Sequence, residues 1–411
     1  MLRHYKKHIF TLKEMLNELD PTSSNLDHVV NIQRYILRLI LHTEKKITDK
    51  KEELKELKAT LRTKSSSKEK SKNIKTKCSG LQKSIDDYYF LLYVWRCFGD
   101  GIAFKYLDKW SLKRLMFNSN NPDIKQSSGS IGGKKGIVNE FELLLEAKAN
   151  GVPALLCDLT NTIRHGDICL LGASDPYVIE VKSSDNTNKR VKRQLRSIDI
   201  IHSYLKNDAG DIAGVEGMQR VELIVEERHH NDSINIAIDS AVSGKNCSIN
   251  PEKGVYYIGI DVGSNPDYGA LLSGIKEPMI FLLNEAKTKK NWGNYYPFTL
   301  SIKSAASLFA FLKGDIYLIT VLDSGVMKEM AEDIGYKLEI IESKDVEGFK
   351  LTKNVSEAEE PFTGIVSGHF VGRLGFEFLS LKWFFENEKN LLNQIQENYK
   401  FKKATESNIF E

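Results

Sequence analysis

The front of the chain has the hydrophobic spacing of one long helix. Apolar residues between positions 27 and 63 recur at intervals of three, four or seven, so they fall on one stripe of a helix. From Thr43 onward most other positions are lysine or glutamate, and such a helix needs a partner along its apolar seam. Serines interrupt the pattern at 65–67, and a second helix is expected over about 72–98. The pattern predicts an antiparallel helical hairpin, a coiled coil, at about 27–98.

The rest of the chain alternates helix-like and strand-like patterns. A short helix is expected over 102–117, and the Asn-, Ser- and Gly-rich segment 118–136 is interpreted as a mobile linker. Beyond it we expect a helix at 137–149, strands at 154–159, 167–171 and 177–182, and a helix at 189–206. Further strands are expected at 221–226, 234–238, 255–262, 279–283 and 316–322, with helices near 304–312, 325–334 and 375–397.

These patterns divide the chain into four regions. We expect a helical region at 1–117, a linker at 118–136, an α/β core at 137–210, and a C-terminal α/β or α+β region at 211–411.

Composition narrows the class of protein. The chain has 411 residues, 41% of them hydrophobic and 27% charged, which excludes a wholly disordered or low-complexity protein. No stretch approaches the ~18–20 apolar residues of a membrane span, and the first ten residues do not resemble a secretory signal. The five cysteines are widely spaced without a CxxC pair, which argues against a disulfide framework or a Cys-based zinc site. We expect a cytoplasmic protein with no membrane partner.

The net charge of +3 conceals an asymmetry along the chain. Residues 1–150 carry 29 lysines and arginines against 18 acidic residues, whereas residues 211–411 carry 21 against 30. The basic front favours a polyanionic partner, and the acidic rear is expected to complete the fold or to bind a protein partner.

The most informative charged residues follow the 137–149 helix. Asp167 begins one expected strand, and Glu180 and Lys182 share a face of the next, because side chains alternate across a strand. The surrounding residues are apolar, and buried charges are costly unless they are paired, bound to metal or functional. Opposed residue numbers in an antiparallel hairpin have a constant sum, and Asp167 faces Glu180 if that sum is 347. This register requires a four-residue loop or a bulge.

Glu140 is the expected third carboxylate. It lies within the apolar stripe of the 137–149 helix, whereas Glu142 falls farther round.

This arrangement over residues 137–206 resembles the PD-(D/E)xK nuclease superfamily. In place of the usual Pro-Asp, Gly166 precedes Asp167, and Gln194 matches half of a Gln–Tyr pattern found on the last helix of some members. The resemblance implies a restriction-endonuclease-like mixed sheet flanked by helices. It also implies Mg²⁺, or Mn²⁺, bound by Asp167, Glu180 and Glu140, with Lys182 orienting or activating the attacking water.

The sequence therefore predicts a metal-dependent nuclease acting on DNA, with a role in restriction or antiviral defence. The basic face of the 189–206 helix, with Arg190, Arg193 and Arg196, is expected to contact phosphates beside Gln194. The hairpin is expected to support a homodimer, although its own second helix could cover the seam. Two alternatives stay open: a coiled-coil interaction protein with an inactive nuclease-like core, and a nuclease directed at RNA.

A weaker pattern lies in the C-terminal region. The stretch from Tyr257 to Ser264, with Asp261 and Gly263, resembles the first phosphate loop of the actin and sugar-kinase ATPases, and Asp323-Ser-Gly325 resembles a second. Only about 60 residues separate them, too few for the intervening domain of that family, so a turn after a core strand is preferred.

Overall fold

The computed structural model describes residues 1–62, 67–127, 129–134, 136–181, 189–220, 223, 225–342, 347–353 and 362–407. The chain forms two compact units. Unit 1 comprises Met1–Arg220 with Tyr296–Leu300 and Ser304–Phe309, and unit 2 comprises Val221–Tyr295, Ser301–Lys303 and Ala310–Glu411. The division falls after Arg220, so residues 118–136 lie inside unit 1.

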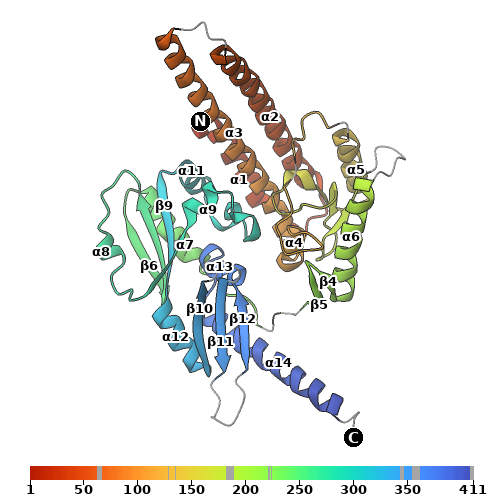
Figure 1. The fold of residues 1–411 in the computed structure, drawn as a ribbon, viewed down its shortest axis with the longest axis vertical. Helices are drawn as coiled ribbons and strands as arrows, with labels where there is room; N and C mark the ends of the chain where they lie inside the picture. Colours follow the sequence, from red (N-terminus) through yellow and green to blue (C-terminus); the bar gives the residue numbers. More distant parts are fainter. Residues whose placement is uncertain are drawn as a thin grey trace. The chain divides into compact units, whose positions relative to one another are not determined.

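Unit 1 is built on the helical hairpin (Figure 1). Helix α2 spans Asp27–Arg62 and α3 spans Lys68–Tyr106, so the expected hairpin is confirmed and its second helix is longer than expected. Their apolar residues bury one another along the seam, among them Ile47, Leu54 and Ile85. Because α3 covers the seam of α2 within one chain, the seam gives no argument for a homodimer.

The other helices of unit 1 are short except α6. They are a 3-10 helix Leu2–Tyr5, α1 Lys6–Glu18, α4 Lys109–Arg114, α5 Ile137–Ala149, a 3-10 helix Cys157–Leu159 and α6 Lys189–Asn207. The expected helices at 137–149 and 189–206 are confirmed. The single helix expected over 102–117 is wrong, because α3 runs to Tyr106 and Asp108 caps a separate α4.

The segment expected to be a mobile linker is held against α2. Both carboxylate oxygens of Glu44 accept backbone hydrogen bonds, from Ile131 N at 3.0 Å and from Gly132 N at 2.6 Å. The Ile131 side chain is fully buried. These two backbone N–H groups bond the Glu44 carboxylate and not water, so the turn belongs to the folded unit in spite of its glycine- and serine-rich composition.

A three-stranded sheet lies beside the hairpin. Its strands are β1 Ala154–Leu156, β2 Ile168–Leu170 and β3 Tyr177–Ile179, in the order β1-β2-β3 and antiparallel throughout. The expected mixed sheet is therefore wrong for the described strands. The Gln33 amide of α2 bonds Ala154 O at 2.8 Å and Leu156 N at 2.9 Å, and so satisfies the free edge of β1. Strands β4 Ala209–Ile212 and β5 Val215–Gln219 form a separate hairpin.

Unit 2 contains two antiparallel sheets with helices packed on them. One has the order β6-β7-β9-β8, with β6 Cys247–Glu252, β7 Val255–Asp261, β8 Pro278–Leu282 and β9 Ile316–Asp323. The other has β10 Tyr336–Glu342, β11 Glu347–Lys353 and β12 Thr363–Ser367. The helices are α7 Asn231–Val242, α8 Tyr268–Leu271, α9 Leu283–Thr288, a 3-10 helix Trp292–Asn294, α12 Ser324–Asp333, α13 Gly368–Phe376 and α14 Leu381–Ser407. Helices α10 Phe298–Ser301 and α11 Ala305–Lys313 contribute residues to both units.

Strands occur close to the positions expected for them at 255–262, 279–283 and 316–322. Helices likewise occur close to the positions expected at 304–312, 325–334 and 375–397. The last of these is broken in two, because Phe378 adopts a left-handed conformation (φ 57°) between α13 and α14. No strand covers the described residues of 221–226, namely 223, 225 and 226.

The strand expected at 234–238 is wrong, because this stretch lies in α7. The run Ile-Asn-Ile-Ala-Ile alternates over five residues, yet Ile234, Ala237, Ile238 and Ala241 are the buried positions and Ile236 is 55% exposed. Spacing of three, four and seven is helical, so the longer window decides the element.

The two loops that resemble ATPase phosphate loops do not meet. In the antiparallel pairing of β7 with β9, Asp261 lies opposite Ile316 and Val255 lies opposite Leu322. Asp261 and Asp323 are therefore at opposite ends of the sheet, and the preferred interpretation of a turn after a core strand is confirmed for Asp261.

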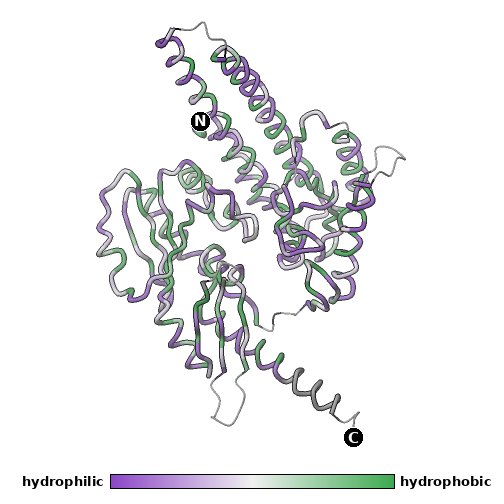
Figure 2. The backbone as a smooth tube through the Cα atoms, in the orientation of Figure 1, coloured by the Kyte–Doolittle hydropathy of each residue, from purple (hydrophilic) through white to green (hydrophobic). Residues whose placement is uncertain are grey.

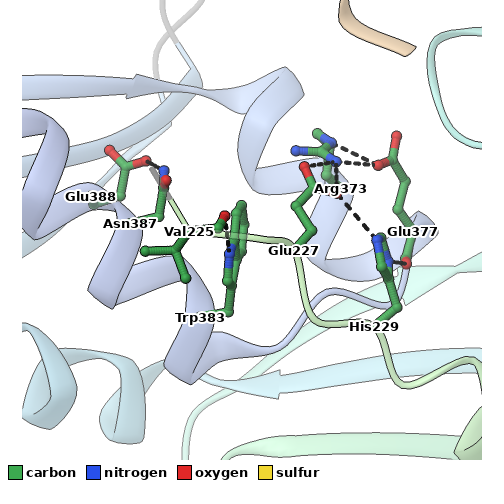
Figure 3. A network of polar contacts seen from close by, with 8 residues as sticks. All are labelled: Val225, Glu227, His229, Arg373, Glu377, Trp383, Asn387 and Glu388. Atoms are coloured by element: carbon green, nitrogen blue, oxygen red, sulfur yellow. Dashed lines mark hydrogen bonds and ion pairs between the residues drawn. The ribbon is translucent and has the colours of Figure 1, made fainter. Parts of the chain in front are cut away.

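A buried ion-pair network joins the 225–230 segment to α13 and α14 (Figure 3). The fully buried Arg373 bonds Glu377 Oε2 through Nε at 2.7 Å and both oxygens of Glu227 at 2.8 and 3.0 Å. His229 accompanies the pair, with Nε2 3.1 Å from Glu227, and Trp383 Nε1 donates to Val225 O at 3.1 Å. No helix in the described part of the chain is long and apolar enough to cross a membrane.

Replacing Arg373 by methionine should strongly destabilise unit 2. The substitution fills similar space but leaves two buried carboxylates without their cation, which costs about 3–5 kcal/mol. Urea unfolding followed by tryptophan fluorescence measures the loss. Lys337→Met is the matched control, because its ion pair with Glu339 is exposed and should matter little. Equal stability of the two variants would contradict the structural role of Arg373.

Candidate active site

Three carboxylates selected from the sequence come together at one end of the β1-β2-β3 sheet. Glu140 lies in the first turn of α5, Asp167 directly precedes β2, and Glu180 directly follows β3. The negative charges of Asp167 and Glu180 both act on Glu140. These three side chains therefore lie near one another, whereas Lys182, which was expected to join them, lies outside the described residues.

The strand register produces this convergence. Ile168 pairs with Ile179 and Leu170 with Tyr177, so opposed residue numbers sum to 347, the register that sets Asp167 across from Glu180. Six residues, 171–176, separate the two strands, and an even number of loop residues is what this register requires. The Asp167 carboxylate accepts a hydrogen bond from Val181 N at 2.8 Å, which fixes it against the end of β3.

Gly166 is required at the position before Asp167. Its φ of +69° lies in the left-handed region, and a Cβ there would come within 3.0 Å of Ile179 O and 3.1 Å of Val178 Cβ. Glycine suits this position because the chain turns left-handed while touching β3. Proline, with φ fixed near −65°, cannot take this conformation.

Glu140 is nearly buried and holds its proton unusually tightly. Only 5% of the residue is exposed, and its Oε2 atom has no hydrogen-bond partner among the described residues. Burial raises its pKa from 4.5 to about 7, and the charges of Asp167, Asp158 and Glu180 add to the shift while Lys134 opposes it. A buried carboxylate oxygen without a hydrogen-bond partner, repelled by other carboxylates, suits a ligand for a cation or a group that exchanges protons near neutral pH.

Asp158 is a fourth carboxylate of the site, and sequence reasoning missed it. It follows β1 in the 3-10 helix, is 6% exposed, and forms an ion pair with Lys134. Arg96 of α3 donates from Nε to the Asp158 backbone oxygen at 3.0 Å. The run Ala-Leu-Leu-Cys-Asp was a usable signal, because an aspartate at the end of an apolar strand next to β2 falls at the same sheet end as Asp167.

Two lysines bring positive charge to these carboxylates. Burial disfavours the charged form of Lys134, but its hydrogen bond and ion pair with Asp158 outweigh this effect and raise its pKa. Lys125 lies near Glu180 and donates to His165 Nδ1 at 3.1 Å. His165 is buried and keeps a pKa of about 4 because of burial and the charge of Lys125, so it is a neutral acceptor. No sequence signal marked either lysine, since both lie in the segment interpreted as a linker.

The structure describes only some of the other residues that were expected to take part in catalysis or DNA binding. Lys182 lies outside the described residues. Arg193 and Arg196 are exposed and Gln194 is half-buried on α6, while the side chain of Arg190 is not described. Arg193 lies near Lys125, because its charge contributes to lowering the pKa of that lysine after the larger effect of burial. Helix α6 packs on β3 through His202, whose ring stacks on Tyr177 at 4.3 Å.

The donor atoms of the site fit a hard divalent cation in type. Four carboxylates supply oxygen, which Mg²⁺ and Mn²⁺ prefer, and Glu140 Oε2 is buried beside them. Within the described residues no group of three or more His, Cys, Asp and Glu side chains has the geometry of a metal site. The carboxylates are therefore gathered without forming a closed coordination shell.

Comparisons of the chain with models of protein families, with curated proteins and with solved structures find no match.

Glu140→Gln should stabilise the protein at neutral pH and leave it unchanged in acid. Below pH 4.5 the carboxyl is protonated in both the folded and the unfolded chain. Between pH 4.5 and about 7 it ionises freely only when unfolded, so the folded state loses stability as pH rises. The gain from the variant should reach on the order of 2 kcal/mol by pH 7.

Denaturant unfolding at pH 4 and at pH 7 measures this gain. Glu142→Gln is the control, because Glu142 is exposed on the same helix and its loss should not produce a pH-dependent gain. A Glu140→Gln gain that is the same at both pH values would contradict the buried, charge-repelled state of Glu140.

Proposed function

We propose that this protein is a metal-dependent nuclease of the PD-(D/E)xK type that hydrolyses phosphodiester bonds of DNA. One observation carries the proposal. The β2–β3 register sets Asp167 across from Glu180, and the charges of both act on the buried carboxylate of Glu140. Gathering like charges in a partly buried place is costly unless cations offset them, and a bound metal ion would do so.

In this proposal Asp167 and Glu180 hold the metal, with Glu140 as a third ligand and Asp158 as a further acidic neighbour. Bound Mg²⁺ or Mn²⁺ would neutralise a phosphate oxygen and lower the pKa of a water. As a ligand, Glu140 would be held in its deprotonated form by the charge of the cation. Lys182 has the role that the superfamily resemblance implies, and Lys125 and Lys134 add positive charge for the phosphate and its developing negative charge.

In this proposal the DNA substrate binds on the α6 side of the site. Arg193 and Arg196 are exposed on the helix that follows β3, and the charge of Arg193 acts on Lys125, which in turn interacts with Glu180. Arginines of this kind neutralise backbone phosphates and so hold the strand at the site without reading its sequence.

Asp167→Asn should abolish cleavage while leaving DNA binding intact. The substitution keeps the size of the side chain and removes a ligand charge, so metal-dependent cleavage should fall by at least about 100-fold. Binding should persist or strengthen, because a carboxylate that repels phosphate is gone. Plasmid cleavage with Mg²⁺, Mn²⁺ or EDTA and gel-shift titration provide the two readouts.

The matched control is Glu142→Gln, which removes one exposed carboxylate from the neighbouring α5 and should cut at the wild-type rate. An Asp167→Asn protein with undiminished cleavage would remove this site from the mechanism. Cleavage of an RNA of the same sequence, with DNA left intact, would keep the site and replace the substrate.

A further inference from the structure

The outer part of the hairpin carries an unusual excess of positive charge on α3. Residues 68–85 contain six lysines against one acidic residue, Glu69. The facing stretch of α2, residues 44–62, has seven basic residues interleaved with five acidic ones. Figure 2 shows this outer hairpin as predominantly hydrophilic. The charge of the arm is therefore concentrated on one of its two helices.

Four of these lysines form a straight stripe. At 100° per residue, Lys68, Lys72, Lys75 and Lys83 fall within an arc of about 80°, and this arc is centred about 130° from the seam residues Ile74 and Ile85. All four lysines are exposed, and none has an ion-pair partner within the described residues. With a rise of ~1.5 Å per residue the stripe is about 22 Å long. We name these four residues the lysine stripe.

Repulsion among the lysines of the stripe lowers the stability of the helix that carries them. Lys68 and Lys72 are four residues apart, and Lys72 and Lys75 are three apart, so like charges face each other and destabilise the helix. A polyanion laid along the stripe would cancel this repulsion and release its own counterions.

We propose that the lysine stripe of α3 is a docking surface for the phosphate backbone of duplex DNA. A stiff helix with a linear row of ammonium groups matches a stiff duplex, which presents ~1 negative charge per 1.7 Å of axis. Single strands are held mainly by stacking on aromatic side chains, and residues 68–87 contain no aromatic residue. Ammonium groups that contact phosphates carry no information about the bases, so the lysine stripe binds duplex DNA without sequence preference.

The stripe is a second contact, separate from the carboxylate site. Arg96, which donates to Asp158 O, lies thirteen residues beyond Lys83 on the same helix, about 20 Å farther along its axis. The identity of the ligand as DNA rests on the proposed nuclease function, whereas the binding surface itself does not require cleavage.

The test compares two fourfold variants in the full-length Asp167→Asn protein. One removes the stripe, with Lys68, Lys72, Lys75 and Lys83 changed to glutamine. The control removes the same charge from α2, with the exposed Lys45, Lys46, Lys55 and Lys58 changed to glutamine. Fluorescence anisotropy in EDTA follows binding to a labelled duplex of about 30 base pairs between about 50 and 200 mM salt.

The stripe variant should bind on the order of tenfold more weakly or worse, and its plot of log affinity against log salt should be shallower by about 2–4, at ~0.9 per lost phosphate contact. The α2 control should keep a slope within about one of the parent. Circular dichroism should show undiminished helix content in the stripe variant, because the substitutions remove repulsion.

An unchanged slope of log affinity against log salt in the stripe variant would overturn the proposal, as would an equal loss of affinity in both variants. Equal stripe-dependent binding of a single strand would also overturn it. Displacement of the duplex by polyglutamate at equal charge would favour a protein partner over DNA. If the wild-type protein cleaves DNA with Mg²⁺ but binding does not depend on the stripe, the docking surface is rejected and the proposed nuclease function stands. If binding depends on the stripe but the wild-type protein does not cleave, the nuclease function is rejected and the docking surface stands.

Discussion

The antiparallel register of β2 and β3 is the constraint on which the charge arrangement of unit 1 depends. Side chains alternate across a strand, so a slip of one residue would turn Asp167 to the opposite face from Glu180. The loop 171–176 lies at one end of this hairpin and the left-handed Gly166 at the other, and together they set the register. Once it is set, the apolar residues between the carboxylates face the core and the carboxylates share one end of the sheet.

The helical hairpin then holds this end of the sheet together. Gln33 of α2 satisfies the edge of β1, Glu44 of α2 holds the turn that leads to Lys134, and Arg96 of α3 bonds the backbone of Asp158. Lys134 in turn neutralises Asp158. The hairpin is therefore structural support for the acidic site as well as an arm that extends from it, and both roles come from a single pair of helices.

Much of this arrangement was predictable, and the failures have physical reasons. The helices at 27–62 and 137–149 and the β2–β3 pair followed from periodicity, because each buries one regular face. The 131–134 turn was misjudged, since its order comes from the distant Glu44, which no local pattern reveals. Lys134 was missed for the same reason, because its ion pair forms only in the folded unit, whereas Asp158 did have a local signal in the apolar strand that precedes it. At 234–238 a window of five residues was too short to separate alternation from a helical stripe.

If the gathered carboxylates bind a divalent cation, anomalous diffraction from a crystal grown with Mn²⁺ will locate it. We expect one or two anomalous peaks within about 2.0–2.3 Å of carboxylate oxygens from Asp167, Glu180 and Glu140. These peaks should be lost in crystals of Asp167→Asn that still show the same β2–β3 register. A wild-type crystal in excess Mn²⁺ with the carboxylates free of neighbouring molecules and no peak among them would contradict the account.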